Sequence, residues 1–477
     1  MKTILLSRRQ NHGSVILMCL CIAAVLGVLL ASALVYTHVQ NVSVNRSQNW
    51  NAAIVLSEAG VEEALSHLNR GAPFFDPANA TNNLTSNGWT DQGNGVYSAP
   101  RRYFNDINTT LSSTAGGIGA SDYYDVSIRF TGAKPMIYAT GYVHIPLIAS
   151  AGSSPLFANA LQVNPTYYQS RNVRVDTKID ALFSVAMAAI YQIDLKGKNI
   201  TTDSFDSADP NYSDNGMYPM NDITKTKDNG DVVTDGVIID TLSVGNAKIK
   251  GRIKTGPGGT ATIGPNGSVG TRAWVEGGNT GIQDGHYAND MNVAFPVPTV
   301  PSGTYYFPPS GNIGGTNYNA ILGSGNYYLN SMGNSTYRVI VTGEAKLWVL
   351  GNINYTGNDI LIIAPGGSLK LYMSGSSAKI GGNGIVNQTG NAANFIYYGT
   401  SGNTTLEFNG NANFTGAIYA PNADFTLGGG GSDTYDFVGA SVSKNIKMNG
   451  HFRFHYDENL ARVAGSRGFI PTNWAEN

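Results

Sequence analysis

Aspartates gather in two loop-like stretches of this sequence. The first stretch, residues 201–216, is rich in Pro, Asn and Ser and holds four of them: Asp203, Asp206, Asp209 and Asp214. Carboxylates with carbonyl-rich neighbours provide the oxygen ligands that Ca²⁺ takes. The spacing fits no EF-hand loop, so solvated turn residues are the favoured interpretation and no metal site is predicted. The same holds for the second stretch, which contains Asp222, Asp228, Asp231 and Asp235.

Paired carboxylates would also indicate an enzyme that cleaves polysaccharides, since glycoside hydrolases place two Asp or Glu residues around the scissile bond. Outside the loops, the C-terminal half offers chiefly four carboxylates: Asp359, Glu344, Glu407 and Asp424. Their spacing does not predict that they converge on one face of a sheet. We therefore expect no enzyme, and a membrane-tethered carbohydrate-active enzyme is the alternative.

Two histidines, His451 and His455, are four residues apart, which could suggest a metal site. In a strand, an even separation merely places both side chains on one face with Arg453 between them. We predict a packed terminal strand there. The sequence also has no nucleophile elbow, phosphate-binding loop, HExxH motif or dinucleotide fingerprint. No catalytic, cofactor-binding or metal-ligating residue is predicted, and no cofactor is expected.

Composition narrows the range of functions. The 477 residues carry a formal net charge of -2, and no block of Lys and Arg forms the electrostatic footprint of a nucleic-acid-binding protein. We expect no nucleic-acid partner. The two cysteines, Cys19 and Cys21, both fall in an apolar stretch, so the remainder of the chain cannot form disulfides. Abundant glycine, 58 residues, favours short strands and tight turns.

An apolar segment at residues 14–36 contains no charged side chain. A helix of that length reaches about 34 Å, enough to cross a hydrocarbon core of roughly 30 Å, whereas the apolar region of a secretory signal is about 7–15 residues. Lys2, Arg8 and Arg9 precede the segment, and the positive-inside rule then keeps the N-terminus in the cytoplasm. We expect a single-pass inner-membrane protein whose main body is periplasmic or at the cell surface.

Helical character continues past the membrane. No proline occurs between Thr37 and Arg70, and apolar residues from Ile54 to Leu68 form one stripe. Arg70 in the last turn and Gly71 just beyond it suit a helix C-terminus. The pattern predicts one long helix over residues 14–70.

A basic leader that ends in glycine (residues 8–13, RRQNHG), the apolar span and a downstream segment (residues 53–64, AIVLSEAGVEEA) occur together. This combination resembles the N-terminal signature of PilX-type minor type IV pilins. The resemblance implies that a prepilin peptidase cuts after Gly13 and leaves Ser14 as the mature N-terminus. It also implies partners among other pilin or pseudopilin subunits. A plain signal anchor that is never cut is the alternative.

The fifth mature position departs from the pattern of most major pilins. Those proteins carry a Glu there, which pairs with a neighbouring subunit, whereas this chain has Met18. Some minor pilins and tip-located pseudopilins lack that Glu. The resemblance therefore implies a minor, priming or tip role rather than a bulk filament subunit.

Three strand-like runs follow a loop rich in Asn, Thr and Gly. They cover residues 123–130, 136–143 and 170–179, and the first and third alternate between apolar and polar side chains. Alternation of period two indicates one buried and one solvated face, so we expect an antiparallel sheet laid on the preceding amphipathic helix. The architecture of pilins is the same.

Beyond residue 181, short alternating segments are interrupted by Gly or Gly-Asn every few residues. This rhythm favours a right-handed parallel β-helix, or a related solenoid, over a sandwich of two sheets, which is the alternative. Residues 414–423 (FTGAIYAPNA), 437–440 (FVGA) and 449–457 (NGHFRFHYD) resemble the C-terminal β domain of large pilin-like surface proteins. We expect residues 457–460 to cap the open end of the stack.

These observations predict four regions. They are a basic leader (1–13), a transmembrane and pilin-like helix (14–70), a pilin-like antiparallel β region (71–180) and a Gly-rich β-helix-like domain (181–477). The predicted function is structural or adhesive: a minor, tip-type pilin or pseudopilin-like surface protein of the type IV pilus or type II secretion class. Some of the 26 tyrosines, if exposed on rung faces, could bind surface carbohydrate by stacking.

Overall fold

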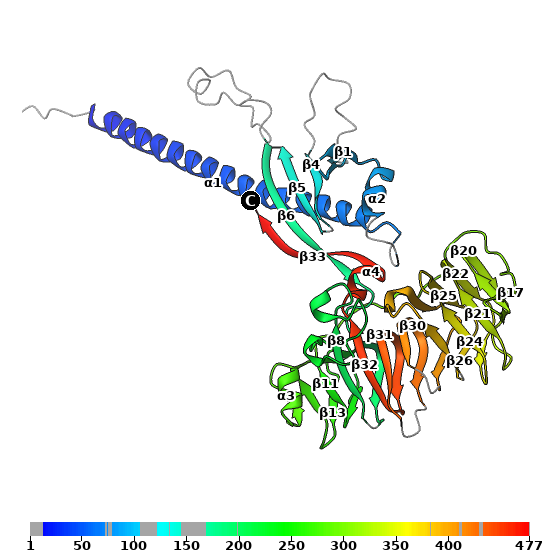
Figure 1. Ribbon diagram of the computed structural model, residues 1–477. Coiled ribbons are helices and arrows are strands. Elements are labelled where there is room, and N and C mark those ends of the chain that lie inside the picture. Colours follow the sequence, from blue (N-terminus) through cyan, green and yellow to red (C-terminus); the bar gives the residue numbers. More distant parts are fainter. Residues whose placement is uncertain are drawn as a thin grey trace, which may run out of the picture. The chain divides into compact units, whose positions relative to one another are not determined.

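The computed structural model describes residues 13–476 except residues 72–73, 75–78, 105–121, 133, 145–167, 198, 382, 410–412 and 429–432 (Figure 1). The predicted leader, with Lys2, Arg8 and Arg9, therefore lies outside the described residues apart from Gly13. The chain divides into two compact units. One comprises Met1–Leu68, Thr81–Lys178 and Ile470–Asn477, and the other Asn69–Ala80 and Ile179–Phe469. The predicted regions are each continuous in sequence, whereas this division assigns Asn69–Ala80 to the second unit and Ile470–Asn477 to the first.

The first unit is built on one long helix, α1 (Gly13–Leu68). It ends at Leu68, two residues before the predicted end at Arg70, so Arg70 is not in its last turn, and Gly71 takes a left-handed φ of 88°. From Val15 to Tyr36 its apolar side chains are exposed, whereas Ala53, Val61, Ala64 and Leu68 are fully buried. The same helix thus has an apolar half without protein cover and an amphipathic half that packs.

The amphipathic half packs on an antiparallel sheet. Its strands are β1 (Thr90–Gly93), β2 (Val96–Ser98), β3 (Arg102–Phe104), β4 (Asp122–Thr131), β5 (Lys134–His144), β6 (Tyr168–Ala181) and β33 (Ser466–Glu476), in the order β1-β2-β4-β5-β6-β33 with β3 beside β4. Buried residues alternate along β4 and the middle of β6, as predicted, and also along β5. The segment α2 (Ala80–Ser86) precedes β1.

The second unit is a solenoid of parallel strands with three walls. The chain first lays down an earlier block: β7 (Met187–Leu195), β8 (Thr201–Phe205), β9 (Val232–Thr234), β10 (Leu242–Gly245), β11 (Lys248–Lys250), β12 (Ile253–Lys254), β13 (Ala261–Ile263), β14 (Ser268–Gly270), α3 (Arg272–Glu276), β15 (Gly281–Ile282) and β16 (Tyr287–Ala288). A crossover with the hairpin β17 (Gly311–Ile313) and β18 (Thr316–Tyr318) follows.

A later block then adds β19 (Ala320–Leu322), β20 (Gly325–Leu329), β21 (Arg338–Val341), β22 (Glu344–Val349), β23 (Ile353–Tyr355), β24 (Ile360–Ile363), β25 (Ser368–Met373), β26 (Ser377–Ile380), β27 (Ile385–Asn387), β28 (Phe395–Gly399), β29 (Thr405–Phe408), β30 (Phe414–Leu427), β31 (Tyr435–Met448) and β32 (Phe452–Asp457), followed by α4 (Leu460–Val463). All the ladders between these rungs are parallel. The predicted solenoid is confirmed, and the sandwich is not.

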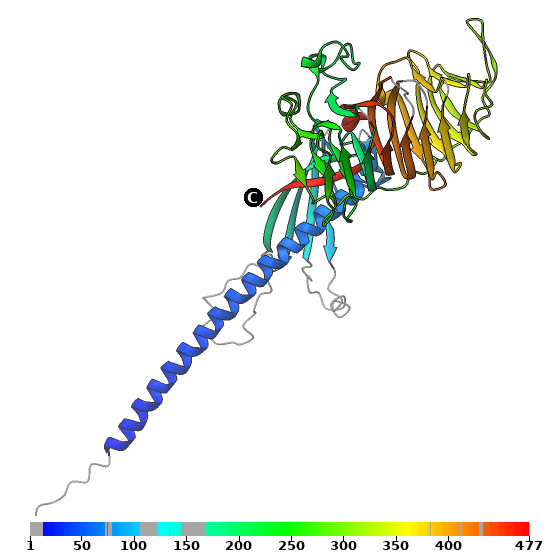
Figure 2. The ribbon, with the colours of Figure 1, turned by 90° about the horizontal axis from the view of Figure 1, so that it is seen from below.

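The rungs do not stack in sequence order. The earlier block grows from β7 outward, through β9 and β12 to β16. The later block starts at the opposite end of the stack, with β20, and grows back through β22, β25, β28 and β30 to β31. There β31 pairs with β7 and β32 pairs with β8. Figures 1 and 2 show the result, with β8 beside β32 and β31 in the middle of the stack. We call this junction the seam.

The seam overturns two expectations. β32 is not a terminal strand, because it lies between β31 and β8. Residues 457–460 do not cap an open end either: Asp457 faces Phe205 of β8 in register, and Leu460 is fully buried. Both expectations assumed that rungs follow one another in sequence order.

The interior of the solenoid is a column of apolar side chains that continues through the seam. Phe414, Phe437 and Phe454 stack across three rungs, with ring centroids 4.5 Å and 4.3 Å apart. Such stacks bury large aromatic area in rungs that are otherwise only a few residues wide. The solenoid therefore has a hydrophobic core without any disulfide, and its outer walls are free to carry function.

Candidate functional site

The predicted processing residues, Gly13 and Ser14, are the first two residues of α1. The helix from Val15 is long and apolar enough to cross a membrane, and none of its most apolar stretch is buried by the protein. Met18, at the position where major pilins have Glu, lies within this stretch and is 65% exposed. Cleavage after Gly13 stays a prediction.

The four aspartates of the first acidic loop do not converge on a common point. Asp203 contacts His455, and the others have separate partners: Arg462 for Asp206, the backbone N–H of Asn211 for Asp209, and Lys225 for Asp214. Those of the second loop also diverge, because Asp222, Asp228 and Asp231 accept from the backbone N–H groups of Thr224, Arg272 and Arg252. Among the described residues, no group of three His, Cys, Asp or Glu side chains could hold a metal ion.

Of the four carboxylates weighed for an enzyme, Glu344 begins β22 and Asp359 precedes β24, whereas Glu407 and Asp424 lie on the adjacent strands β29 and β30, two positions apart in register. Asp359 is buried and accepts from the backbone N–H groups of Asn334, Ser335, Tyr337 and Thr356. Burial would raise the pKa of Asp359, but these hydrogen bonds outweigh it and hold the pKa below its ordinary value. Glu407 and Asp424 pair with Lys379 and Lys444 on the outer wall. Asp359 thus stabilises a corner of the solenoid and has no lone pair left for chemistry.

His455 lies at the centre of a buried network. Its Nδ1 is 2.6 Å from Asp203 Oδ1 and its Nε2 is 3.1 Å from Asp436 Oδ1. Because ionised carboxylates only accept, this geometry favours the charged imidazole, in which both ring nitrogens donate. Burial would lower the pKa of His455, but the hydrogen bonds to the two carboxylates raise it above its ordinary value. Tyr218 stacks on the ring and donates to Asp203 Oδ2 at 2.9 Å.

The network extends to Arg453 and joins three strands. Arg453 donates through Nε and Nη2 to the two oxygens of Asp436. Burial would raise the pKa of Asp436, but the bonds from His455 and Arg453 hold it below its ordinary value. Because Asp436 lies on β31, His455 on β32 and Asp203 on β8, the network links the three strands that meet at the seam. His451 precedes β32 and takes no part in it.

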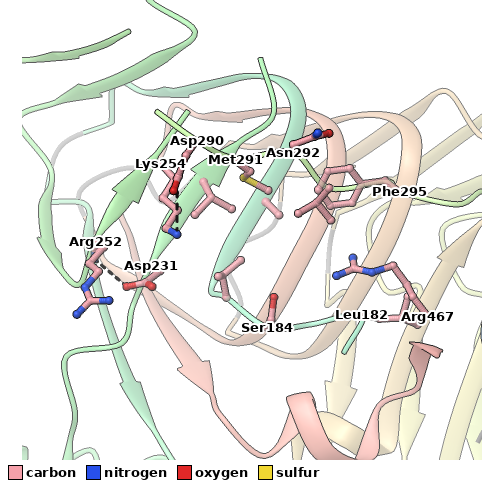
Figure 3. Close-up of a pocket in the computed structure, with 14 residues that line it drawn as sticks. Leu182, Ser184, Asp231, Arg252, Lys254, Asp290, Met291, Asn292, Phe295 and Arg467 are labelled. Atoms are coloured by element: carbon pink, nitrogen blue, oxygen red, sulfur yellow. Dashed lines mark hydrogen bonds and ion pairs between the residues drawn. The ribbon is translucent and has the colours of Figure 1, made fainter. Parts of the chain in front are cut away.

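A cleft of about 370 Å³ opens beside the first rung of the earlier block (Figure 3). Apolar side chains such as Val233 and Met291 line it, and burial raises the pKa of Asp231 there. Two of the three cations that line it have partners within the unit: Lys254 lies 3.9 Å from Asp290, and Arg467 forms two hydrogen bonds to Asp180. The third cation is Arg252.

A different wall of the solenoid carries two ordered columns of side chains, which we call the lysine–aromatic face. On β20, β22 and β25 the interior residues alternate with outward ones. The register places Asn326, Lys346 and Lys370 in one outward column, and Tyr328, Trp348 and Tyr372 in the next. A hollow of about 430 Å³ lies over the first column.

Sequence reasoning missed this face. Its signal is a repeated Lys-Leu-aromatic triplet, KLW at residues 346–348 and KLY at residues 370–372. In a strand, the first and third residues of such a triplet point the same way, and stacked rungs bring like positions together. We expected some exposed tyrosines to bind carbohydrate, but the sequence did not indicate which ones.

Comparison with known proteins gives one family model over part of the chain and a weak structural match. Residues 297–463 match the model of a domain of unknown function (DUF7305), a range that covers the crossover and the later block. No curated protein matches the chain. A solved structure of the competence-associated pilin ComZ from Thermus thermophilus is similar at 10% identity, with 90% of this chain and 97% of that chain covered. Its TM-score is 0.23, too low to support a shared fold or function.

Proposed function

We propose that this chain is a pilin-like surface protein of the minor, tip-located type, in a type IV pilus or type II secretion system, and that its solenoid is an adhesive head. The observation that carries the proposal is the division of α1. Its first half exposes a continuous apolar surface, and its second half packs on an antiparallel sheet. A subunit that is anchored in a bilayer and later enters a helical bundle needs both halves.

Met18 supports the tip-located type. In a membrane-embedded bundle, a buried N-terminal amine is costly unless a carboxylate pairs with it. Met18 cannot supply one to the subunit that follows, so the proposed neighbours are Glu-bearing pilin subunits rather than further copies of this chain. The inner membrane and a prepilin peptidase are the other proposed partners, with the N-terminus cytoplasmic and the main body outside.

The separate partners of the buried and wall carboxylates support a role without catalysis. An outer face of lysine and aromatic side chains is what an adhesive head would use.

N-terminal sequencing tests the proposal. We expect the mature chain to begin at Ser14, and the Gly13→Val variant to remain longer and to be missing from sheared filaments. Gly27→Val is the matched control, because it makes the same change inside the apolar helix, where a Cβ meets nothing within 4 Å. A mature protein that still begins at Met1 would reduce the assignment to a plain signal anchor.

A further inference from the structure

We propose that the lysine–aromatic face binds a polysaccharide that bears carboxylates, such as a polymer of uronic acids. The proposal rests on the adhesive role proposed above and names the ligand class of the head. The proposed contacts come from side chains of β20, β22 and β25 and of the segment just before β17.

The two lysines carry the charge argument. Lys346 and Lys370 face each other directly on adjacent rungs, which are about 4.8 Å apart. Like charges directly opposite across strands destabilise a sheet. Among the described residues, neither lysine has an ion-pair partner, although the exposed Glu344 stands on the same face. An anionic ligand bridging both ammonium groups would remove this repulsion.

The aromatic column is covered at one end and open at the other. Toward the seam, Phe74 packs edge-on against Tyr398 and Tyr419, with ring centroids 5.8 Å and 5.3 Å away, and both tyrosines are buried. Away from the seam, the cover ends. Trp348 and Tyr328 are partly exposed, and Phe307, which packs edge-on against Tyr328, is 58% exposed.

Trp348 is held in a fixed orientation. Its Nε1–H donates to Ser374 Oγ at 2.9 Å, and Tyr305 packs edge-on against the ring. Fixed, partly exposed aromatic rings offer contact area at low entropic cost, with an apolar body and a wet edge. The C–H faces of pyranose rings stack on such surfaces, while their carboxylates would reach the lysine column beside it.

The spacing of the face suits a polymer. Lysine recurs on two adjacent rungs of the first column, and partly exposed aromatic rings recur on two adjacent rungs of the next, Tyr328 and Trp348. An extended sugar chain that runs along the solenoid axis would therefore meet each kind of side chain twice. The hollow of about 430 Å³ is lined by Asn326, Glu344, Lys346, Ser368 and Lys370, so it presents one carboxylate beside hydroxyl, amide and two ammonium groups.

Nucleic acid is the less favoured anion. Proteins that bind it tightly neutralise about 6–10 phosphates, and this face presents two lysines, Lys346 and Lys370, on a chain of net charge -2. A carboxylate polymer needs fewer contacts when sugar rings also stack.

The test uses the full chain in detergent and measures binding to polygalacturonate, to its fully methyl-esterified form and to a single-stranded oligonucleotide. We expect polygalacturonate to bind and the ester to bind at least about tenfold more weakly, because esterification removes the charge. Lys346→Gln with Lys370→Gln should weaken binding to polygalacturonate by about tenfold or more. Tyr306→Ser with Phe307→Ser changes two residues that are already exposed and should weaken the binding of both polymers.

The matched control is Lys379→Gln with Lys444→Gln, which removes the same charge from two wall lysines that already pair with Glu407 and Asp424. Equal binding of the two polymers, tighter binding of the oligonucleotide, or equal losses in the two lysine variants would overturn the proposal. So would a lower melting temperature of the Lys346→Gln, Lys370→Gln chain, because relief of repulsion should not destabilise it. A chain that begins at Ser14 yet binds neither polymer would overturn this inference alone.

Discussion

At His455, three ionisable side chains that would each be costly to bury alone are buried together. The imidazolium is hydrogen-bonded to Asp203 and Asp436, and Arg453 completes the charge balance. Removing one member of such a network leaves the other charged groups buried without a partner, which is strongly destabilising. Replacing the whole network by well-packed apolar residues usually changes the free energy of unfolding much less. The network thus couples the state of one ring to three strands.

We predict that His455→Ala destabilises the second unit by about 3–5 kcal/mol, because two carboxylates stay buried without the imidazolium. The measurement is the calorimetric transition of that unit. His451→Ala is the control: it removes a neighbouring imidazole outside the network and should change the transition by less than about 1 kcal/mol. Equal losses in the two variants would mean that the network contributes nothing specific.

The same residue predicts a pH dependence. The pKa of His455 is raised in the folded protein, so its contribution is fully present below its unfolded pKa of about 6.5 and is lost as pH rises through the folded pKa. The pKa of Asp436 is lowered, so its contribution disappears only in acid, below about pH 4. The transition of the second unit should therefore fall in temperature above neutral pH, and His455→Gln should flatten that decline. If the transition temperature of His455→Gln declines with rising pH as steeply as that of the unmodified chain, other groups cause the decline.

At the scale of elements, α1 and β5 approach so closely that a side chain cannot fit between them. A Cβ at Gly141 would lie 2.2 Å from the carbonyl oxygen of Ala53, and the Gly141 N–H donates to Ser57 Oγ at 2.9 Å. The single hydroxyl proton of Ser57 is within hydrogen-bond reach of two backbone carbonyl oxygens, those of Ala53 at 3.0 Å and Arg171 at 2.9 Å. Backbone contact replaces side-chain packing at this crossing.

We predict that Gly141→Ala destabilises the first unit by about 1–3 kcal/mol, because the helix must shift away from the sheet. Hydrogen exchange of β5 would report the change without interference from the second unit. Gly27→Ala, in the exposed part of α1, adds the same methyl group where nothing lies within 4 Å and should leave β5 protected as before. Fast exchange of β5 in both variants would refute the packing argument.

Local pattern predicted these elements well. The pattern of apolar residues predicted the long helix and the strands at residues 123–130, 136–143 and 170–179. It could do so because α1, β4, β5 and β6 each bury one side, and the pattern shows which residues lie on that side. The lysine–aromatic face was not predicted, since two KLW-like triplets become one surface only when the register of β22 and β25 is known. The His455 network was missed for the same reason: Asp203 and His455 are 252 positions apart.

At the scale of the whole chain, the rhythm of strands predicted a solenoid but not the order of its rungs. Glycine turns and alternating strands look the same whether rungs follow the sequence or are permuted. The order is decided by pairing between distant strands, and the β31–β7 and β32–β8 ladders are such pairs. The expectation of a terminal strand and cap near residue 457 failed because it relied on sequence order.

An engineered disulfide would test the permuted order. Lys447 pairs in register with Asp194 across the seam and with Thr426 on its other side. In a Cys19→Ser, Cys21→Ser background, Lys447→Cys with Asp194→Cys should cross-link on mild oxidation, because neighbouring strands place the Cα atoms within disulfide range. Thr426→Cys with Lys447→Cys is the positive control, and Asp194→Cys with Thr426→Cys, two rungs apart, should stay reduced. A seam pair that stays reduced would favour rungs in sequence order.

The seam also determines the order in which parts of the solenoid can form. A chain that emerges from its N-terminus presents β7 and β8 long before β31 and β32 exist to cover them. During that interval, β7 is an open sheet edge, the kind of surface that pairs with other polypeptides. The crossover must reach the far end of the stack before the later block can return to fill the gap. Folding of this chain therefore passes through a half-built solenoid, and a helper that holds strand edges would matter more here than for a solenoid whose rungs stack in sequence order.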